Sequence, residues 1–360
     1  MAEAFRIIDT GVREGRSNIA FDAALIDLRQ ADAVPDTIRF MRFPPTALIG
    51  RHQDLSREIN LAYCEQDGVG TVRRITGGGA IYLDEGQLGW ELVFHRASLG
   101  IARLPDLAQE ICNAAAAGLS ELGVNAKFRP RNDIEVDGRK ISGTGGFFDG
   151  DILIYQGTVL VDMNAEQMVR ALNVPQQKVA KHNLDSAAQR VVTLKELLGE
   201  DLPDLETIKA ALVKAFTQHF GIDAVPGAIS QQEEALAQEY FDAEIGTDEF
   251  VADIDNPGAD RNVYAGTHTG AGGTINAFVK LEGPKHRTVQ RVLLSGDFFV
   301  TPPRVVFDLE AHLQGSAVSE LAPRIEQFFD AADIGMLSVT ADDFRIAIEA
   351  AVQAAIDAAP

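Results

Sequence analysis

The chain has 360 residues, of which 46% are hydrophobic and 24% are charged, and its formal net charge is −21. This composition is typical of a globular protein, and the length allows two domains with cores of their own. The acidic surplus leaves no basic surface to neutralise phosphates, which argues against nucleic acid as the main partner. Two cysteines build no disulfide framework, and no apolar run is long enough for a membrane span. We therefore expect a cytoplasmic, monomeric protein without a signal peptide or membrane contact.

The N-terminal part of the chain predicts short strands that alternate with helices. A helix is expected from Ser17, because apolar residues recur after it at spacings of three and four. Gly68 is expected to end a second helix, which begins at Ile59. Alternation over Thr37–Phe43 is typical of a half-buried strand. The expected strands are 6–9, 37–43, 47–50, 71–72, 81–83 and 87–95, and further helices are expected over 59–67 and 105–123.

A polar triplet, Arg51-His52-Gln53, follows directly after the strand that ends at Gly50. Polar side chains at a strand exit form either a ligand-facing rim or a solvated turn, and the spacing alone leaves both open. The two cysteines, Cys64 and Cys112, lie within expected helices, where a cysteine acts as a small buried hydrophobic residue.

A glycine-rich segment lies between two expected strands. Its sequence is Arg73-Arg74-Ile75-Thr76-Gly77-Gly78-Gly79-Ala80-Ile81-Tyr82-Leu83-Asp84. Consecutive glycines tolerate positive φ and let backbone N–H groups approach an anion closely, and a neighbouring arginine adds a forked donor to phosphate. The segment opens no helix, so it is neither a Walker loop nor a dinucleotide fingerprint. A plain glycine-rich hairpin is the alternative.

A second segment carries a lysine on an expected strand. The run 131–146 predicts a strand over Asp133–Val136, a tight Asp-Gly turn, and a second strand that holds Lys140. Arg139 and Lys140 then point to opposite faces. An inward lysine needs an anion or a carbonyl to satisfy it, whereas an outward one is solvated.

Three blocks in this order resemble the lipoate–protein ligase family, which shares its fold with biotin–protein ligases. The blocks are LIGRHQ at 48–53, RRITGGGAIYLDEG at 73–86 and RNDIEVDGRKISGTGG at 131–146, and the strand 156–161 continues the likeness. The resemblance covers roughly residues 10–200. It implies that lipoate or octanoate attacks the α-phosphate of ATP, and that a lysine of a carrier domain then attacks the acyl-AMP.

The resemblance also implies roles for particular residues. Lys140 would be the catalytic cation on the α-phosphate and the acyl oxygen, and Mg²⁺ would be held mainly by substrate oxygens near Asp133. ATP and acyl-adenylate would be bound by Arg74, Thr76, Gly77, Gly78, Gly79, Ala80, Ile81, Tyr82, Asn132, Asp133 and Lys140. Lipoate would be bound by Arg51, His52, Gly79, Lys140, Gly143 and Gly157. The implied partners are lipoyl-domain carriers, such as the E2 component of 2-oxoacid dehydrogenases or the glycine cleavage H protein.

The chain departs from the family pattern in two places. Family members often carry a His-Asp-x-Gly-Asn block where this chain has Leu83-Asp84-Glu85-Gly86-Gln87, which puts acyl-chain preference or carrier contacts in doubt. The related octanoyltransferases have a nucleophilic cysteine shortly before the lysine block, and residues 124–139 contain none. This favours the ATP-dependent ligase over an ATP-independent octanoyl or lipoyl transferase. A non-catalytic acyl-carrier-binding protein on the same fold is a third reading, and a biotin ligase is disfavoured by the Arg-Arg-Ile-Thr-Gly-Gly-Gly loop.

The C-terminal third predicts a second domain. Helices are expected over 193–199, 205–220 and 230–241, followed by an acidic Pro/Gly segment over 242–260 that is typical of a linker or hinge. Strands over 273–281 and 288–295 and helices over 306–313, 318–331 and 341–355 then resemble the accessory domain of lipoate ligases. We expect an α+β protein with mixed or antiparallel sheets flanked by helices, divided into a catalytic domain (1–245), a linker (246–260) and an accessory domain (261–360).

Overall fold

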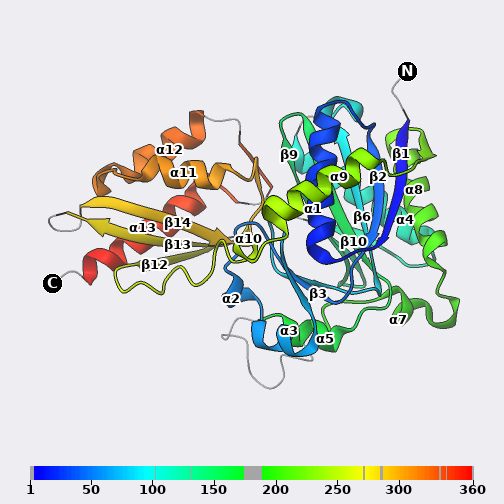
Figure 1. Ribbon diagram of the computed structural model, residues 1–360, viewed down its shortest axis with the longest axis horizontal. Coiled ribbons are helices and arrows are strands. Elements are labelled where there is room, and N and C mark those ends of the chain that lie inside the picture. Colours follow the sequence, from blue (N-terminus) through cyan, green and yellow to red (C-terminus); the bar gives the residue numbers. More distant parts are fainter. Residues whose placement is uncertain are drawn as a thin grey trace. The chain divides into compact units, whose positions relative to one another are not determined.

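A computed structural model describes residues 4–101, 103–130, 132–173, 189–270, 272–283, 287–331, 334–337 and 339–358 (Figure 1). The chain forms two compact units. The first consists of Met1–Leu48, Ile59–Arg74 and Ile81–Val251, and the second of Ile49–Glu58, Ile75–Ala80 and Ala252–Pro360. The second unit therefore includes two short stretches from the N-terminal part of the chain. The predicted division into domains stays a prediction, because compact packing is not a test of independent folding.

An eight-stranded mixed sheet forms the centre of the first unit within the described residues. In spatial order its strands are β11 (Ala224–Pro226), β1 (Phe5–Val12), β2 (Thr37–Arg42), β6 (Gln87–His95), β10 (Ile152–Leu160), β9 (Arg139–Asp149), β8 (Asp133–Val136) and β7 (Lys127–Arg129). β1 is parallel to both of its neighbours, whereas every other pairing is antiparallel. A smaller sheet has the order β4 (Gly70–Arg73), β3 (Thr46–Ile49) and β5 (Ile81–Leu83). The predicted mixed α+β class is confirmed.

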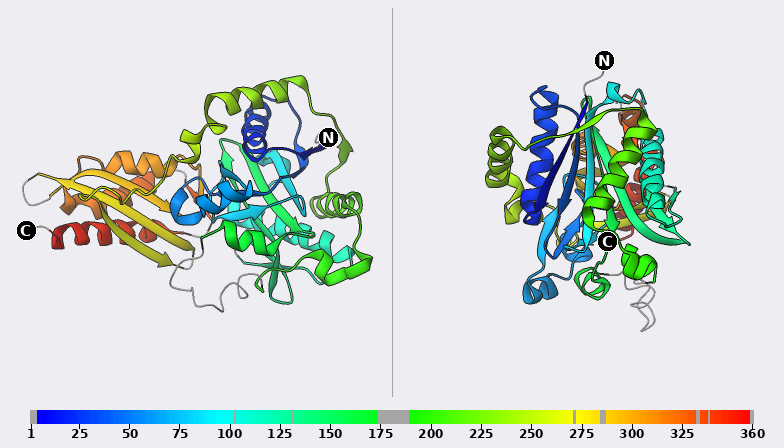
Figure 2. Two further views of the ribbon diagram at one scale, coloured as in Figure 1. Left: turned by 60° about the horizontal axis from the view of Figure 1, so that its bottom comes forward. Right: turned by 90° about the vertical axis from the view of Figure 1, so that its right-hand side faces the viewer.

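Helices cover both faces of the large sheet. Figure 2 shows α1 (Gly15–Gln30) and α9 (Gln231–Tyr240) on one face, and α4 (Leu104–Glu121) and α8 (Leu205–Phe220) on the other. The other helical segments of this unit within the described residues are α3 (Leu61–Asp67), η1 (Arg96–Ser98), α5 (Ala165–Ala171), α7 (Leu194–Leu198), η3 (Gly199–Asp201), the π-helical turn η4 (Phe241–Ile245) and α10 (Asp248–Val251). α1 begins two residues before Ser17, because the Glu14 side chain accepts the Ser17 N–H and caps the helix there.

A buried ionic network crosses the sheet beneath α1. The Arg39 guanidinium on β2 donates to Asp22 of α1 at 2.5 Å and to Glu91 of β6 at 2.9 Å. Gln156 of β10 donates to both carboxylates at 2.7 Å. Asn18 accepts a further Arg39 N–H at 2.7 Å, and all these charged groups are buried. The hydrogen bonds offset part of the cost of burying these groups, and the network ties one helix to three strands.

The second unit is built on a three-stranded antiparallel sheet. Its order is β12 (Tyr264–Gly270), β13 (Gly273–Glu282) and β14 (Thr288–Gly296). α11 (Val305–Leu313), α12 (Leu321–Ala331) and α13 (Ala341–Asp357) contribute with the sheet to one apolar core, and α2 (Leu55–Glu58), η5 (Val318–Glu320), β15 (Val300–Thr301) and β16 (Gly335–Met336) complete the unit. Ile275 and Leu294 of the sheet and Leu309 and Phe344 of the helices are almost inaccessible within this core.

The segment expected as a linker contains regular structure. Residues 242–251 include most of η4 and all of α10, and Phe250, Val251 and Ile254 are buried. The acidic and Pro/Gly composition reflects the exposed side of this stretch, whereas these apolar residues anchor its other side. β12 and α5 were also absent from the predicted elements, since neither has a regular apolar pattern. No helix among the described residues has both the length and the apolar character that a bilayer crossing requires.

Candidate functional site

The hairpin of β8 and β9 presents Lys140 as the sequence predicts. Asp137 and Gly138 form the connecting turn with φ values of 50° and 79°, as a two-residue hairpin turn requires. A register shift between Ile134 and Glu135 places Glu135 opposite Lys140 and Asp133 opposite Gly143. Lys140 also borders residues 190–192, because its N–H donates to the Arg190 carbonyl and its carbonyl accepts from Val192.

The Lys140 side chain lies over Gly143 and ends at Asp133. Its Nζ is 2.7 Å from Asp133 Oδ1, and the side chain is 34% exposed. A Cβ at position 143 would lie 2.6 Å from that Nζ, so only glycine leaves room for this path. Lys140 is thus neither fully inward nor freely solvated: it is a partly exposed cation held by a carboxylate. Gly143 explains the held position, and a contact of Gly143 with lipoate stays a prediction.

Asp133 is held between two cations. Arg129 of β7 contacts its Oδ2, and Lys140 contacts its Oδ1. Burial raises the pKa of Asp133, but Lys140 and Arg129 outweigh it and hold the pKa below its ordinary value. In the described part of the chain, no cluster of three or more His, Cys, Asp or Glu side chains could hold a metal ion. The carboxylate that we predicted to lie near Mg²⁺ is therefore part of an ion-pair network.

Asn132 is bound three times to Thr144 on β9. The Asn132 carbonyl accepts from the Thr144 N–H at 2.8 Å and from its hydroxyl at 2.9 Å, and Asn132 Nδ2 donates to the Thr144 carbonyl at 2.6 Å. These bonds extend the β8–β9 ladder by one residue beyond Asp133. The predicted nucleotide-binding pair, Asn132 and Asp133, is thereby fixed next to Lys140.

The glycine run packs closely within the second unit. The Gly78 N–H donates to the Phe298 carbonyl at 3.0 Å. A Cβ at Gly77 would lie 2.3 Å from that carbonyl oxygen, and one at Gly78, where φ is +92°, would lie 2.4 Å from the Phe299 ring. Close packing against a backbone carbonyl thus requires glycine at position 77, and the positive φ together with the Phe299 ring favours it at position 78. In this structure a protein carbonyl accepts the Gly78 N–H, which is one of the groups that we predicted to bind an anion.

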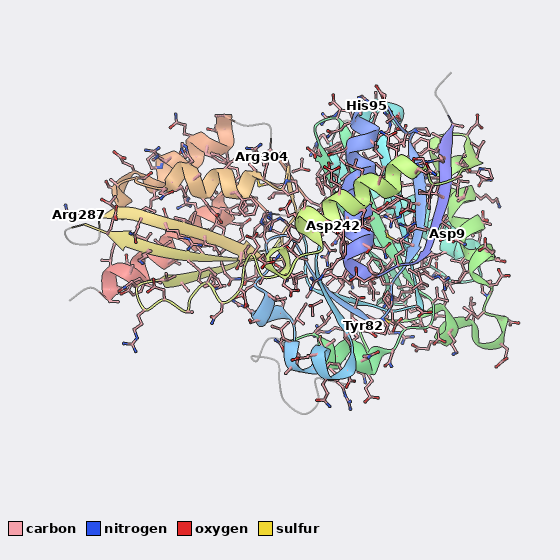
Figure 3. The ribbon with its side chains drawn as sticks, viewed as in Figure 1. Asp9, Tyr82, His95, Asp242, Arg287 and Arg304 are labelled. Atoms are coloured by element: carbon pink, nitrogen blue, oxygen red, sulfur yellow. The ribbon has the colours of Figure 1, made fainter. Side chains whose placement is uncertain are left out.

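The residues beside the glycine run are mostly buried. Arg74 donates to the Leu48 carbonyl at 3.2 Å, and burial lowers its pKa to about 10. Thr76 accepts the Arg51 N–H through its carbonyl at 2.9 Å. Tyr82, labelled in Figure 3, is buried on β5, and its hydroxyl contacts Gln167 of α5 at 2.6 Å. The Tyr82 hydroxyl is therefore directed to α5, so a nucleotide contact there would come from its backbone.

Two more residues of this run were predicted to edge a nucleotide. Ala80 ends the stretch that belongs to the second unit, and Ile81 begins β5, where it pairs with Leu48. Both are half-buried. Their contact with a nucleotide stays a prediction.

His52 and Gln53 of the polar triplet at 51–53 are buried rather than solvated. The predicted contact of Arg51 and His52 with lipoate stays a prediction. The His52 ring is 1% exposed and lies 5.4 Å from the Phe298 ring and 5.3 Å from the Phe307 ring. Gln53 is also buried and accepts the Gly50 N–H. Arg51 forms an ion pair with Asp253 at 2.6 Å and lies over Phe307. The triplet thus contributes to the core and edge of the second unit, because aromatic residues from far along the chain cover it.

Packing against Trp90 explains why position 157 on β10 is a glycine. A Cβ there would lie 2.1 Å from the ring of Trp90, which is buried on β6 and also packs 5.3 Å from Phe216. Trp90 thus packs in the core of the first unit. A lipoate contact of Gly157 stays a prediction.

Residues 14–217 match the family model described as the lipoyl protein ligase A/B catalytic domain. The match covers more than half of the chain. This chain belongs to that family. It is therefore an enzyme of the family that includes lipoate–protein ligases and octanoyltransferases, and the predicted resemblance is confirmed.

Curated relatives of the ligase A/B family fall into two activities. Octanoyltransferase LipM of Moorella thermoacetica is 28% identical over 66% of this chain and 94% of its own length. A probable lipoate-protein ligase A of Mycoplasma pneumoniae is 30% identical over 57% of this chain and 59% of its own length. Lipoate-protein ligase LplJ of Bacillus subtilis is 30% identical over 54% of this chain and 57% of its own length. Both activities are thus represented at similar identity.

Solved structures of the family share the fold. A bi-partite lipoate protein ligase from Thermoplasma acidophilum covers 70% of this chain and 97% of its own, with a TM-score of 0.63 and 24% identity. A P. falciparum protein in complex with lipoate covers 91% of this chain and 95% of its own, with a TM-score of 0.71 and 18% identity. A lipoate-protein ligase A bound with ATP has a TM-score of 0.61 at 23% identity, and covers 70% of this chain and all of its own. At these identities the likeness shows the biotin/lipoate ligase fold.

A cavity of about 570 Å³ in the second unit has none of the predicted site residues in its lining, although Arg51 lies over Phe307 at its wall. It is lined by Lys280 and Arg291 of the sheet and by Phe307 and Glu310 of α11, among others. Burial raises the pKa of Glu310 to about 7, and its carboxylate accepts the Leu294 N–H at 2.6 Å. The family's predicted chemistry involves none of these groups.

Sequence reasoning missed three features of the ligase A/B domain. It did not find the Lys140–Asp133 ion pair, the cover of the glycine run by Phe298 and Phe299, or the hydrogen bonds around Thr144. The hairpin register places Glu135 opposite Lys140, and Asp133 lies two residues further along β8, so only a diagonal pairing across the strands could have indicated this ion pair. No local pattern indicates the other two.

Proposed function

We propose that the protein is an ATP-dependent ligase that attaches lipoate or octanoate to a lysine of lipoyl carrier proteins through an acyl-AMP intermediate. The observation that carries this proposal is the state of the two cysteines. Both Cys64 and Cys112 are buried and free of disulfides. Burial raises the pKa of Cys64 to about 11 and also raises that of Cys112. Because the thiolate is the nucleophile, neither residue is suited to an acyl-thioester mechanism.

In the first proposed step, a carboxylate oxygen of the fatty acid attacks the α-phosphorus of ATP, and pyrophosphate leaves. The protein has little covalent work in such a reaction, so positioned charge provides the catalysis. Lys140 would stabilise the charge on the α-phosphate and the acyl oxygen. Its ion pair with Asp133 directs the ammonium group, and a third of the Lys140 side chain remains accessible.

In the second proposed step, the ε-amine of a carrier lysine attacks the acyl carbon, AMP leaves as the acyl–phosphate bond breaks, and the amine loses a proton. The Thermoplasma acidophilum relative is described with its E2 lipoyl domain, which supports carriers of this kind, with an H protein as a second candidate. We also propose that residues 261–360 act as the accessory domain of the activation step.

The glycine run and the residues around Asp133 would bind the nucleotide. Arg74 and the N–H groups of Gly77, Gly78 and Gly79 would hold phosphate, and Gly78 would exchange its bond to the Phe298 carbonyl for one to a phosphate oxygen. Mg²⁺ would reach the site with ATP, bound mainly by phosphate oxygens and water. The ATP-bound relative supports use of ATP within the family.

Octanoyl transfer from a carrier thioester is the second candidate. It is favoured by the likeness to octanoyltransferase LipM, which extends over 94% of that protein. The two candidates differ in whether acyl transfer needs ATP and whether a cysteine becomes acylated.

One experiment separates the candidates. The purified protein is incubated with an apo lipoyl domain and either ATP, Mg²⁺ and lipoate, or octanoyl-acyl carrier protein without ATP, and intact masses are recorded. We expect modification only in the first mixture, with pyrophosphate released and no acyl adduct on the enzyme. A Cys64→Ser, Cys112→Ser variant should keep this activity, since the hydroxyl that replaces the Cys112 thiol is still a donor. Modification in the ATP-free mixture, with an acyl-thioester in the parent protein, would refute the ligase.

A further inference from the structure

A buried hydroxyl network lies directly behind the Asn132–Asp133 segment. The Tyr155 hydroxyl of β10 lies 2.8 Å from the Thr144 hydroxyl of β9, and the Cys112 thiol of α4 lies 3.2 Å from the same oxygen. Thr144 in turn donates to the Asn132 carbonyl at 2.9 Å. Thr144, Tyr155 and Cys112 are almost inaccessible to solvent.

The donor directions in this network follow from its chemistry. A carbonyl oxygen only accepts, so the single hydroxyl hydrogen of Thr144 is committed to Asn132. Thr144 Oγ1 is then an acceptor towards Tyr155, whose hydroxyl hydrogen must point to it. Each bond strengthens the next, so the network acts as one polarised chain that ends at the Asn132 carbonyl.

The sheet makes room for this arrangement. Tyr155 lies opposite Gly146, and a Cβ at Gly146 would lie 2.7 Å from the Tyr155 Cα and 2.8 Å from its ring. Without a side chain at position 146, the ring crosses diagonally to reach Thr144, two residues away on the same face of β9. A phenylalanine ring would fill this core position as well as the tyrosine ring does. The hydroxyl and its partners therefore serve more than the filling of space.

We propose that Thr144 is a positioning residue for the activation step: its hydroxyl fixes the Asn132 carbonyl and thereby sets Asp133 and the Lys140 ammonium paired with it. Asn132 precedes Asp133 directly, and Asp133 Oδ1 holds Lys140 Nζ at 2.7 Å. A shift of Asn132 therefore moves the carboxylate that directs the lysine. Thr144 itself contacts no substrate in this scheme. The proposal rests on the proposed ligase function.

The test compares three single variants of the full-length protein. Thr144→Val removes the hydroxyl and keeps the shape, Thr144→Ser keeps the hydroxyl, and Ile154→Val trims a buried residue of β10 whose side chain points away from the network. Each is measured for melting temperature, for kcat and KM of pyrophosphate release with ATP and with lipoate, and for hydrogen exchange of the amides in 129–145.

We expect Thr144→Val to lower kcat/KM for ATP by about tenfold, since a misplacement of 1 Å costs up to 10²-fold. Its effect on the KM for lipoate should be smaller, and Thr144→Ser and Ile154→Val should stay within about twofold of the parent on the same reasoning. Exchange in 129–145 should accelerate only in Thr144→Val. Equal losses in Thr144→Val and Ile154→Val at equal melting temperature would overturn the proposal.

The exchange measurement keeps this inference separate from the proposed function. If the parent protein releases no pyrophosphate with ATP, the ligase proposal fails. Faster exchange confined to Thr144→Val would then still support the positioning of Asn132 by the hydroxyl. Unchanged exchange in Thr144→Val would overturn that positioning whether or not the parent is active.

Discussion

Lys140 reaches Asp133 because position 143 carries no side chain. The ammonium is held by a carboxylate that also binds Arg129, so its place depends on three residues of one hairpin and its neighbouring strand. A cation on a flexible stem is useful to a reacting phosphate only when it is directed in this way.

We predict that Lys140→Ala lowers the rate of acyl-AMP formation by about 10²–10⁴-fold, the scale expected when one key electrostatic group is removed. Asp133 keeps Arg129 as a partner, so the fold should persist. Lys195→Ala is the matched control, because Lys195 also pairs with an aspartate, Asp162, and lies outside the predicted site. Pyrophosphate release near the parent level in Lys140→Ala would contradict the assignment.

Asp22 gives the protein a predictable response to pH. Burial and the neighbouring Glu91 raise the pKa of Asp22 from 3.8 to about 8, against the opposing effect of Arg39 and Gln156. Between these two values the folded state keeps a proton that the unfolded state has lost. By linkage, this group's contribution to stability is largest below pH 4, falls as the pH rises, and levels off above pH 8.

We therefore expect Asp22→Asn to flatten the dependence of unfolding free energy on pH between 5 and 8. The measurement is urea unfolding at several pH values in parent and variant. Asp27→Asn is the control, because Asp27 lies on the same helix and is exposed. The assignment fails if the Asp22→Asn curve runs parallel to that of the parent.

At the scale of elements, the glycine run combines two demands. It was predicted as an anion cradle, and the structure gives it a tight contact with Phe298 and Phe299 that fixes its conformation. A loop that is already ordered loses less conformational entropy when a phosphate binds.

We predict that Gly78→Ala destabilises the protein by about 1–3 kcal/mol, because a non-glycine residue is strained at this φ and its methyl group would meet the Phe299 ring. Gly79→Ala serves as the control for stability, since its nearest neighbour, Asp297, lies 3.8 Å from the added Cβ. Thermal unfolding of both variants is the measurement. A Gly78→Ala variant as stable as Gly79→Ala would show that the loop rearranges without cost.

Local patterns were sufficient for most elements and for the lysine hairpin. The β8–β9 turn was predictable because Asp-Gly determines its backbone, and α8 because Asp204 and Gly221 cap it. The burial of His52 was not predictable, because Phe298 and Phe307 cover it from the other end of the chain. The same holds for the Thr144 network, where α4, β9 and β10 contribute one side chain each. Pairing across long separations leaves no periodic signal.

At the scale of the whole molecule, the second unit recruits 49–58 and 75–80 from the N-terminal part of the chain. The predicted nucleotide loop therefore depends for its order on the core formed by the C-terminal residues. Damage to that core should therefore loosen the loop before it affects the first unit.

We predict that Leu309→Ala, in the core of the second unit, accelerates hydrogen exchange in 75–80 and slows adenylation more than transfer from pre-made acyl-AMP. Leu212→Ala in α8 is the matched control, since both leucines are almost fully buried and such truncations typically cost about 2–5 kcal/mol. The control should leave exchange in 75–80 unchanged. Equal acceleration by both variants would show that the loop is ordered independently of the second unit.

The recruitment of 49–58 and 75–80 also sets an order in time. During synthesis, the stretch with His52 and the glycine run leaves the ribosome long before Phe298 and Phe307 exist to cover it. At about 5–20 residues per second, the roughly 100 residues that follow the first unit take on the order of 5–20 s to translate. A nascent chain can bury most of the large sheet in that interval, while residues 75–80 still lack the C-terminal residues that pack on them. The proposed nucleotide loop would thus reach its ordered conformation only after Phe298 and Phe299 have been made.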